Sequence, residues 1–396
     1  MLRRFTGAVL VSISVLLAPA SCVRRAPATV PPPPVPAVTT AAPPPAVLAL
    51  PQRLTDREFW TLITDLSEPS GYFRSDNLLS NELGLQRVIP ELLRTARRGR
   101  VYLGVGPDQN FTYIAALEPA MAFIVDVRRG NLDLHLLYKA LFELSSDRVD
   151  FVARLFSRVR PPLPSTADVR EIFTALNGVP PEEARFAGNL KAVQEHLTKT
   201  HGFPLGADDL QDIEYVYRAF DNYGPGLTYW MNSGGRFGRS SPTYADLMVA
   251  TDEDGILRGY LASDANFQVL KGLEEKNLLV PIVGNFAGPK ALHGLGEYLK
   301  ARHALVSAFY LSNVEQYLNM DGIWTDFCAN VATLPLDETS TFIRSVRSGQ
   351  FGYGVGLGQQ LGNMLAETKA CGAAAVSGLL RGDAGPRQRA FSNCAR

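Results

Sequence analysis

The sequence predicts an α/β fold in which a mostly parallel sheet carries helices on both faces. Two short apolar runs, Val101 to Gly104 and Met121 to Val127, have the continuous hydrophobicity of buried parallel strands. A helical pattern follows each of them, Gln109 to Leu117 after the first and Asn131 to Leu144 after the second. This alternation indicates parallel strands joined by right-handed crossovers.

The same rhythm returns in the last third of the chain. We expect a strand at Leu278 to Val283, a helix at Pro289 to Ala301, a strand at Leu305 to Leu311 and a further short strand at Val331 to Leu334. Residues 150 to 276 separate the two halves and contain several helical stretches. The sequence therefore predicts a large, mostly helical insertion in the sheet domain.

Two helices are expected before the first strand. Thr55 and Glu58 have the spacing of a capping box, which predicts that a helix begins at residue 56. Pro90 suits the first turn of a second helix, and Gly99 suits its end. The segment between these helices is rich in turn formers and hydrogen-bonding side chains.

The first 22 residues have the layout of a secretory signal peptide. Arg3 and Arg4 precede an apolar run from Gly7 to Leu17 that is too short to span a bilayer. The triplet that ends at Cys22 also resembles the end of a bacterial lipoprotein signal, which would attach lipid to that cysteine. We expect a location in the cell envelope or periplasm, with membrane contact only through this end. A cytoplasmic location follows if the leader does not export the chain.

Three further segments follow the leader. Residues 23–50 are rich in Pro and Ala, which favours an extended linker rather than a packed core. Residues 51–348 are expected to form the α/β domain with its insertion. Residues 349–396 are rich in Gly and Ala, and alternating glycines weaken both helices and strands, so we expect a flexible tail.

Composition excludes several classes of partner and site. Lys plus Arg and Asp plus Glu each number 39, and this zero net charge gives no general attraction to nucleic acid. The 5 histidines and 4 cysteines show no zinc-like spacing, so no metal site is expected. In an oxidising compartment Cys371 and Cys394 are candidates for a disulfide in the tail. The oligomeric state stays open.

The turn after the first predicted strand has the features of a nucleotide-binding loop. Gly104 and Gly106 allow a sharp turn and a close approach of backbone N–H groups to a ligand. Asp126, at the end of the second strand, is placed to accept hydrogen bonds from both hydroxyls of a ribose. The alternative readings are a tight turn without a ligand, and an ion pair between Asp126 and Arg128 or Arg129.

The residues after the glycines disfavour a phosphate. Gln109 stands where a dinucleotide site needs a third glycine, so a dehydrogenase is disfavoured. Asp108 adds negative charge at the start of the helix, where a phosphate would otherwise bind. Asn110 completes the loop. An adenosine-containing ligand without phosphates, such as S-adenosylmethionine, is compatible with this loop.

These residues resemble class I S-adenosylmethionine-dependent methyltransferases, which have a Rossmann-like sheet. The stretch VYLGVGPDQNFTYIAALEPAMAFIVDVRRGN and the later AFYLSNVEQYL are similar to an uncharacterised bacterial family with this kind of fold. The resemblance implies that Gly104 and Gly106 lie beside the methionine part of the cofactor and Asp126 beside its ribose. It also implies that Asn285 lies near the adenine.

The acceptor side of the site is less well defined. The resemblance places Ser312 and Asn313 where this fold positions the methyl acceptor. Tyr72, Arg74, Asn77 and Glu82 are candidates for lining the mouth of the site, and the alternative is a polar loop that only connects two helices. Tyr102 replaces an acidic residue often found in these enzymes, and the sequence SNVE differs from their N-P-P-[YF] motif.

Two functions therefore stay open. One is a methyltransferase with an unknown acceptor. The other is a catalytically inactive, membrane-tethered binding protein of the envelope on the same scaffold. The catalytic residues are unknown in either case. The expected leader favours the second function, because the cofactor is a cytosolic compound.

Overall fold

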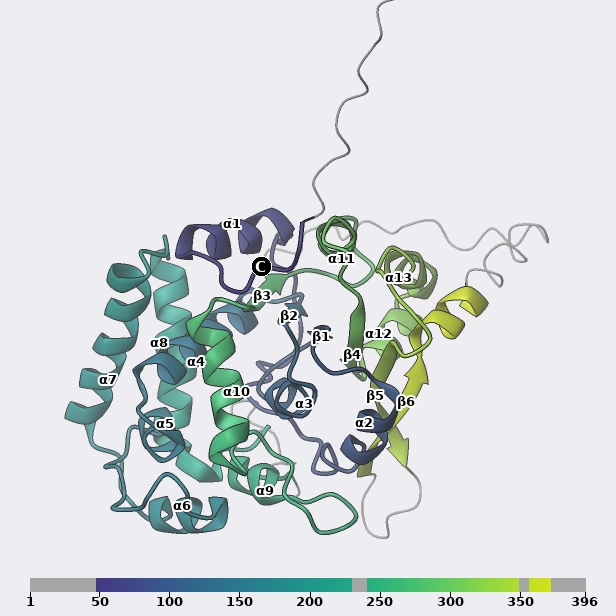
Figure 1. Cartoon of the computed structure of the whole chain (residues 1–396). Coiled ribbons are helices and arrows are strands. Elements are labelled where there is room, and N and C mark those ends of the chain that lie inside the picture. Colours follow the sequence, from purple (N-terminus) through teal and green to yellow (C-terminus); the bar gives the residue numbers. More distant parts are fainter. Residues whose placement is uncertain (1–47, 230–240, 349–355, 372–396) are drawn as a thin grey trace, which may run out of the picture. The chain divides into compact units, whose positions relative to one another are not determined.

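Six strands form one sheet in the order β3-β2-β1-β4-β5-β6 (Figure 1). The first five strands pair in parallel, and β6 pairs antiparallel with β5. The protein is therefore α/β with a Rossmann-like, mostly parallel sheet. The strands are β1 (Val101–Gly104), β2 (Met121–Asp126), β3 (Leu279–Val283), β4 (Val306–Ser312), β5 (Thr341–Ser348) and β6 (Gly356–Asn363).

The computed structural model describes residues 48–229, 241–348 and 356–371. The chain divides into two units, Met1–Ala46 and Val47–Arg396, and all described elements belong to the second. The expected signal peptide, Cys22 and almost all of the expected linker lie outside the described residues. Among the described helices, none combines the length and the hydropathy that a bilayer crossing needs.

Helices cover both faces of the sheet, as the sequence predicts (Figure 1). Phe309 of β4 packs on Phe286 with ring centroids 5.0 Å apart, on the face covered by α11 (Ala291–Lys300) and α13 (Trp324–Val331). The next residue, Tyr310, points to the opposite face and contacts Tyr113 at 5.2 Å. That face is covered by α2 (Ile89–Thr95), α3 (Gln109–Leu117), α4 (Arg129–Leu144) and α10 (Asp264–Glu275).

The first strand-helix-strand unit has nearly the predicted bounds. β1 and α3 begin and end at the predicted residues, and α4 begins two residues earlier than expected. Helix α1 (Asp56–Leu66) begins with the predicted capping box, in which the Glu58 backbone N–H donates to the Thr55 hydroxyl. α1 packs against the edge strand β3 and against α11.

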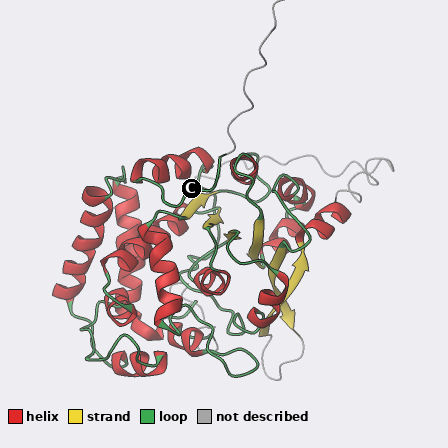
Figure 2. Ribbon diagram, in the orientation of Figure 1, coloured by secondary structure: helices red, strands yellow, loops and turns green. Residues whose placement is uncertain are grey.

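The segment between α4 and β3 is helical wherever it is described, apart from its connecting loops and one isolated bridge (Figure 2). It packs on α4 through aromatic rings, with Phe142 stacked on Phe151 at 4.4 Å and Tyr138 against Phe220 at 6.0 Å. The elements before α10 are α5 (Arg148–Leu155), α6 (Val169–Leu176), α7 (Glu183–Glu195), η1 (His196–Thr200), α8 (Ala207–Tyr223), η2 (Gly224–Gly226) and α9 (Tyr244–Val249).

The C-terminal part differs from the sequence expectation in two places. Residues 331–334, expected as a strand, are the end of α13 and the following turn, and the fifth strand is β5 instead. Residues 356–371, expected in a flexible tail, form β6 and a helix over 364–371. The glycines of β6 are accommodated because the strand pairs along its whole length with β5. Helix α12 (Val314–Met320) follows β4.

A disulfide joins Cys328 of α13 to Cys371 at the end of the last helix. The sequence analysis considered Cys371 and Cys394 as a pair, and Cys394 lies outside the described residues. The observed partner is 43 residues away in the sequence and becomes a neighbour only through the fold.

Candidate functional site

The candidate residues gather where the parallel strands end. The strand order reverses direction between β1 and β4, and open α/β sheets bind ligands in the crevice at such a switch point. Gly104, Asp126 and Ser312 close β1, β2 and β4, so the sheet brings the glycine turn, the expected ribose carboxylate and the expected acceptor residue to one edge.

The glycine turn is held by a histidine that the sequence analysis did not identify. Gly106 has φ of +76°, a conformation that favours glycine. Its carbonyl oxygen is 2.9 Å from Nε2 of His135 on α4. Burial lowers the pKa of His135 to about 4, so the ring is neutral at pH 7 and its Nε2–H donates to the carbonyl.

Asn110 fills the space over Gly104. The Asn110 side chain is fully buried, and its Nδ2 donates to the carbonyls of Val105 at 2.9 Å and Pro107 at 2.7 Å. Its Oδ1 accepts a hydrogen bond from the Tyr102 hydroxyl at 2.9 Å. A Cβ at residue 104 would overlap Oδ1 of Asn110. The packing of the Asn110 side chain therefore explains why residue 104 is a glycine, without any ligand.

The Asp108 carboxylate is buried and accepts no hydrogen bond from any other residue that the structure describes. It is 1% exposed, and neither carboxylate oxygen has a hydrogen-bond partner among the described residues. Although Asp108 precedes α3, its side chain makes no capping bond. Burial raises its pKa to about 7, and its electrostatic neighbours include the hydroxyls of Tyr138, Tyr244 and Tyr260. Asp108 is the one acidic residue in the loop formed by residues 104–110.

Asp126 forms the ion pair with Arg128 that the sequence analysis considered as an alternative. Arg128 donates its backbone N–H at 2.9 Å and its Nε–H at 3.1 Å to Oδ1, and its Nη2–H at 3.1 Å to Oδ2. The same guanidinium donates to the Ser75 and Asp76 carbonyls. Oδ2 keeps one acceptor position, whereas Oδ1 uses both. Binding both ribose hydroxyls would require Arg128 to move.

Glu82 lies at the carboxyl end of β4 and connects β4 to β6. It is 2% exposed and accepts hydrogen bonds from the hydroxyls of Tyr310 at 2.8 Å and Ser312 at 2.7 Å. Nε2 of Gln359 on β6 donates to its other oxygen at 2.9 Å. Gln109 donates to the Tyr310 hydroxyl at 3.2 Å, which joins the glycine loop to this network. The expected acceptor residue Ser312 is thus already bonded to a carboxylate.

The other expected site residues have weaker connections to this edge. Tyr72 is 88% exposed and does not form part of an enclosed site. Asn77 has φ of +48°, and its Oδ1 is buried without a partner in the described chain. Oδ1 of Asn285 accepts from the Ala287 backbone N–H at 2.9 Å and so shapes the turn after β3. Asn313 precedes α12 and makes no side-chain capping bond.

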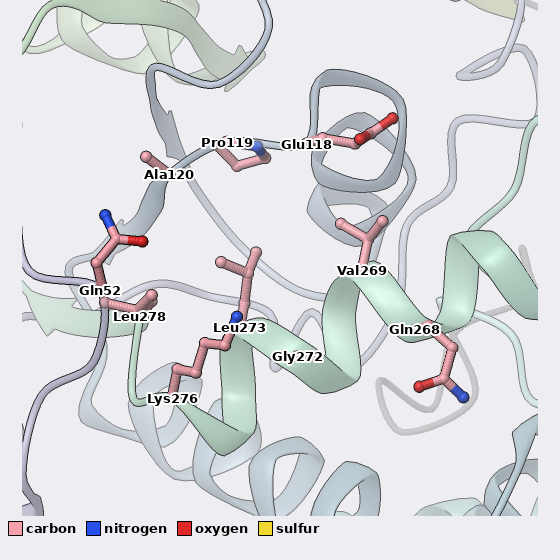
Figure 3. A pocket seen from close by; sticks show the side chains of 10 residues that line it. All are labelled: Gln52, Glu118, Pro119, Ala120, Gln268, Val269, Gly272, Leu273, Lys276 and Leu278. Carbon is pink, nitrogen blue, oxygen red and sulfur yellow. The ribbon is translucent and has the colours of Figure 1, made fainter.

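A cavity of about 260 Å³ lies at the other end of the strands. Ala120 and Leu278, which directly precede β2 and β3, line it together with residues of α10, as Figure 3 shows. None of the expected site residues lines this cavity.

Comparison with known proteins gives a family but no activity. No curated protein matches the chain. A family described as "Domain of unknown function (DUF7790)" matches residues 78–201 and 232–367, which include Gly104, Asp126 and Ser312. Because this match spans more than half of the sequence, the chain belongs to the DUF7790 family of domains of unknown function.

Proposed function

We propose that the carboxyl edge of the sheet binds a phosphate-free, adenosine-containing ligand, with S-adenosylmethionine as the first candidate. The observation that supports this proposal is the buried carboxylate of Asp108, whose oxygens have no hydrogen-bond partner among the described residues. An ionised carboxylate that is buried without a donor destabilises the protein, and a bound hydrogen-bond donor or cation removes that cost. The same negative charge repels a phosphate.

The chemistry of S-adenosylmethionine suits these residues. Its ammonium group offers donors and a positive charge to Asp108, one of its ribose hydroxyls can donate to the remaining acceptor position of Asp126, and its sulfonium carries a transferable methyl group. Gly106 supplies the sharp turn that brings the loop beside the ligand. Asn285 follows β3, and a contact with the adenine would come from its backbone, since its side chain is bonded to the Ala287 N–H.

Transfer of a methyl group would require an acceptor at the end of β4. Ser312 and Asn313 lie there, and Glu82 holds the Ser312 hydroxyl. An acceptor would have to displace this hydrogen bond or bind beside it. The acceptor is unknown, and positioning rather than a strong base would supply most of the rate of such a transfer.

Two observations favour a second candidate, an inactive binding protein of the cell envelope. The Cys328–Cys371 disulfide is typical of an oxidising compartment and agrees with export by the expected signal peptide. The network of Glu82 with Tyr310 and Ser312 occupies the acceptor side. In this function the ligand binds at Asp108 without group transfer, and the lipid or signal end alone contacts the membrane.

Calorimetric titration of S-adenosylmethionine and S-adenosylhomocysteine into the purified protein tests the proposal. We expect micromolar binding, weakened at least tenfold by Asp108→Asn and by Asp126→Ala. Asp221→Asn, which changes a buried aspartate paired with Arg158 in the insertion, should leave the affinity unchanged.

The outcomes separate the two functions. Binding with no methyl transfer to any acceptor supports the inactive binding protein. A folded protein that binds neither compound would contradict the adenosine ligand and direct the search to envelope compounds with an amino group.

A further inference from the structure

Two histidines at the two ends of the η1 turn, His196 and His201, contact Glu143 of α4 near the end of that helix. Glu143 lies in the last turn of α4, whereas the candidate ligand site lies beside its first turn. Nε2 of His196 and Nε2 of His201 are each 2.6 Å from Oε2 of Glu143. The three potential ligand atoms lie within 4.8 Å of one another.

A π-helical turn brings the two histidines together. They are five residues apart, which in an α-helix separates two side chains by about 140° around the axis. Here the backbone N–H of His201 donates to the His196 carbonyl at 3.0 Å, which closes the wider turn of η1. The ring centroids are therefore only 4.8 Å apart. π turns are rare and occur frequently at functional sites.

Neighbouring groups hold the three side chains in position. Nδ1 of His201 is 2.7 Å from Oδ1 of Asp56 on α1, and Asn277 donates to the same oxygen at 2.9 Å. A carboxylate behind Nδ1 is the usual partner of a metal-binding imidazole and directs Nε2 toward the ion. Lys139 donates to Oε1 of Glu143 at 2.7 Å, which leaves Oε2 directed at the histidines.

We propose that Glu143, His196 and His201 bind a divalent transition-metal ion such as Zn²⁺ through Oε2 and the two Nε2 atoms. Two imidazoles and one carboxylate form a known ligand set for Zn²⁺ and for other first-row metals, with at least one position left for solvent. The three side chains are 8%, 18% and 12% exposed, so the cluster is shielded but accessible to solvent.

The fit requires only small side-chain movements. Zn–N bonds of about 2.0 to 2.1 Å place tetrahedral ligand atoms about 3.3 Å apart. The two 2.6 Å distances would therefore lengthen by less than 1 Å when an ion replaces the hydrogen bonds. The bound ion would link α4, the π turn and, through Asp56, α1. This proposal departs from the sequence expectation that the chain binds no metal.

Calorimetric titration of ZnCl₂ alone into the metal-stripped, full-length protein tests the inference. We expect one ion per chain, and at least a 100-fold loss of affinity in His196→Gln and in His201→Gln. His293→Gln is the matched control, because His293 is a partly buried histidine on α11 outside the cluster, and it should bind as the wild type does.

If the histidine variants fail to fold, Asp56→Asn provides a second test. It keeps all three ligands and changes the carboxylate that orients the His201 ring. We expect a ten- to 100-fold loss of affinity with an unchanged circular dichroism spectrum. The inference is overturned if the wild type binds less than one equivalent, or if Asp56→Asn and the folded histidine variants bind Zn²⁺ as tightly as the wild type.

Discussion

Two buried carboxylates of this protein have opposite surroundings. Glu143 accepts hydrogen bonds from Lys139, His196 and His201, whereas the Asp108 carboxylate accepts none from any other described residue. Burial by itself raises the pKa of Glu143, but these three donors outweigh it and hold the pKa well below its ordinary value. At Asp108 burial outweighs the opposing effect of the residue's own backbone N–H and raises the pKa to about 7.

The difference shows that partners, rather than burial, decide what a buried acid contributes. Glu143 joins helices that are distant in the sequence, so its charge is part of the structure. The Asp108 carboxylate makes no hydrogen bond with another described residue, although the Asp108 carbonyl accepts from the Phe111 backbone N–H at 2.9 Å. Glu143→Gln and Asp108→Asn test this contrast, and Gly104→Ala tests the packing of the loop that contains Asp108.

The largest effect is expected from Glu143→Gln, measured by urea unfolding with a chelator present. The substitution leaves the Lys139 ammonium, which is 1% exposed, without its charged partner. Removing one partner of a buried pair costs about 3 to 5 kcal/mol. Glu195→Gln removes a similar pair with Lys199 at the surface, where solvent screens the charges, and should cost far less. Equal effects of the two substitutions would contradict the structural role of Glu143.

A smaller loss, about 2 kcal/mol, is expected for Gly104→Ala. The added methyl group displaces the Asn110 side chain, which then loses its bond to Tyr102. In a Gly104→Ala, Asn110→Ala double variant the methyl group has room, so the two losses should be less than additive. If the stability losses measured by thermal unfolding are additive, the Asn110 side chain does not explain why residue 104 is a glycine.

The smallest effect, with the opposite sign, is expected for Asp108→Asn. The native pKa of Asp108 lies above the unfolded value, so the folded protein binds more protons between about pH 4 and pH 7 and loses stability as the pH rises through that range. The amide does not ionise. The variant should therefore be more stable than the wild type at pH 8, and this difference should shrink toward pH 4. A variant less stable than the wild type at pH 8 would mean that the carboxylate has a partner.

The sequence predicts local elements better than distant contacts. β1, α3 and β2 follow from an apolar run, a glycine turn and a helical period, which are all local features. β5 and β6 were not expected, because the charges of Thr341 to Ser348 and the glycines of β6 hide strands that are stable only when paired.

The candidate site shows the same limit. Gly104, Asp126 and Ser312 could be placed at one edge from their positions after strands. The network around Glu82 could not be predicted, since its partner Tyr310 is 228 residues away. The pairing of His196 with His201 depends on a π turn, which the usual helical period does not indicate.

The disulfide has a consequence for how the sheet edge meets other molecules. Cys328 and Cys371 close a covalent ring that contains both β5 and β6. An unprotected edge strand can detach and pair with a second chain, which leads to domain swapping or aggregation. With the ring closed, β6 cannot travel far from β5 even when their hydrogen bonds break. As long as the disulfide is intact, β6 therefore stays paired within its own molecule rather than with a second chain.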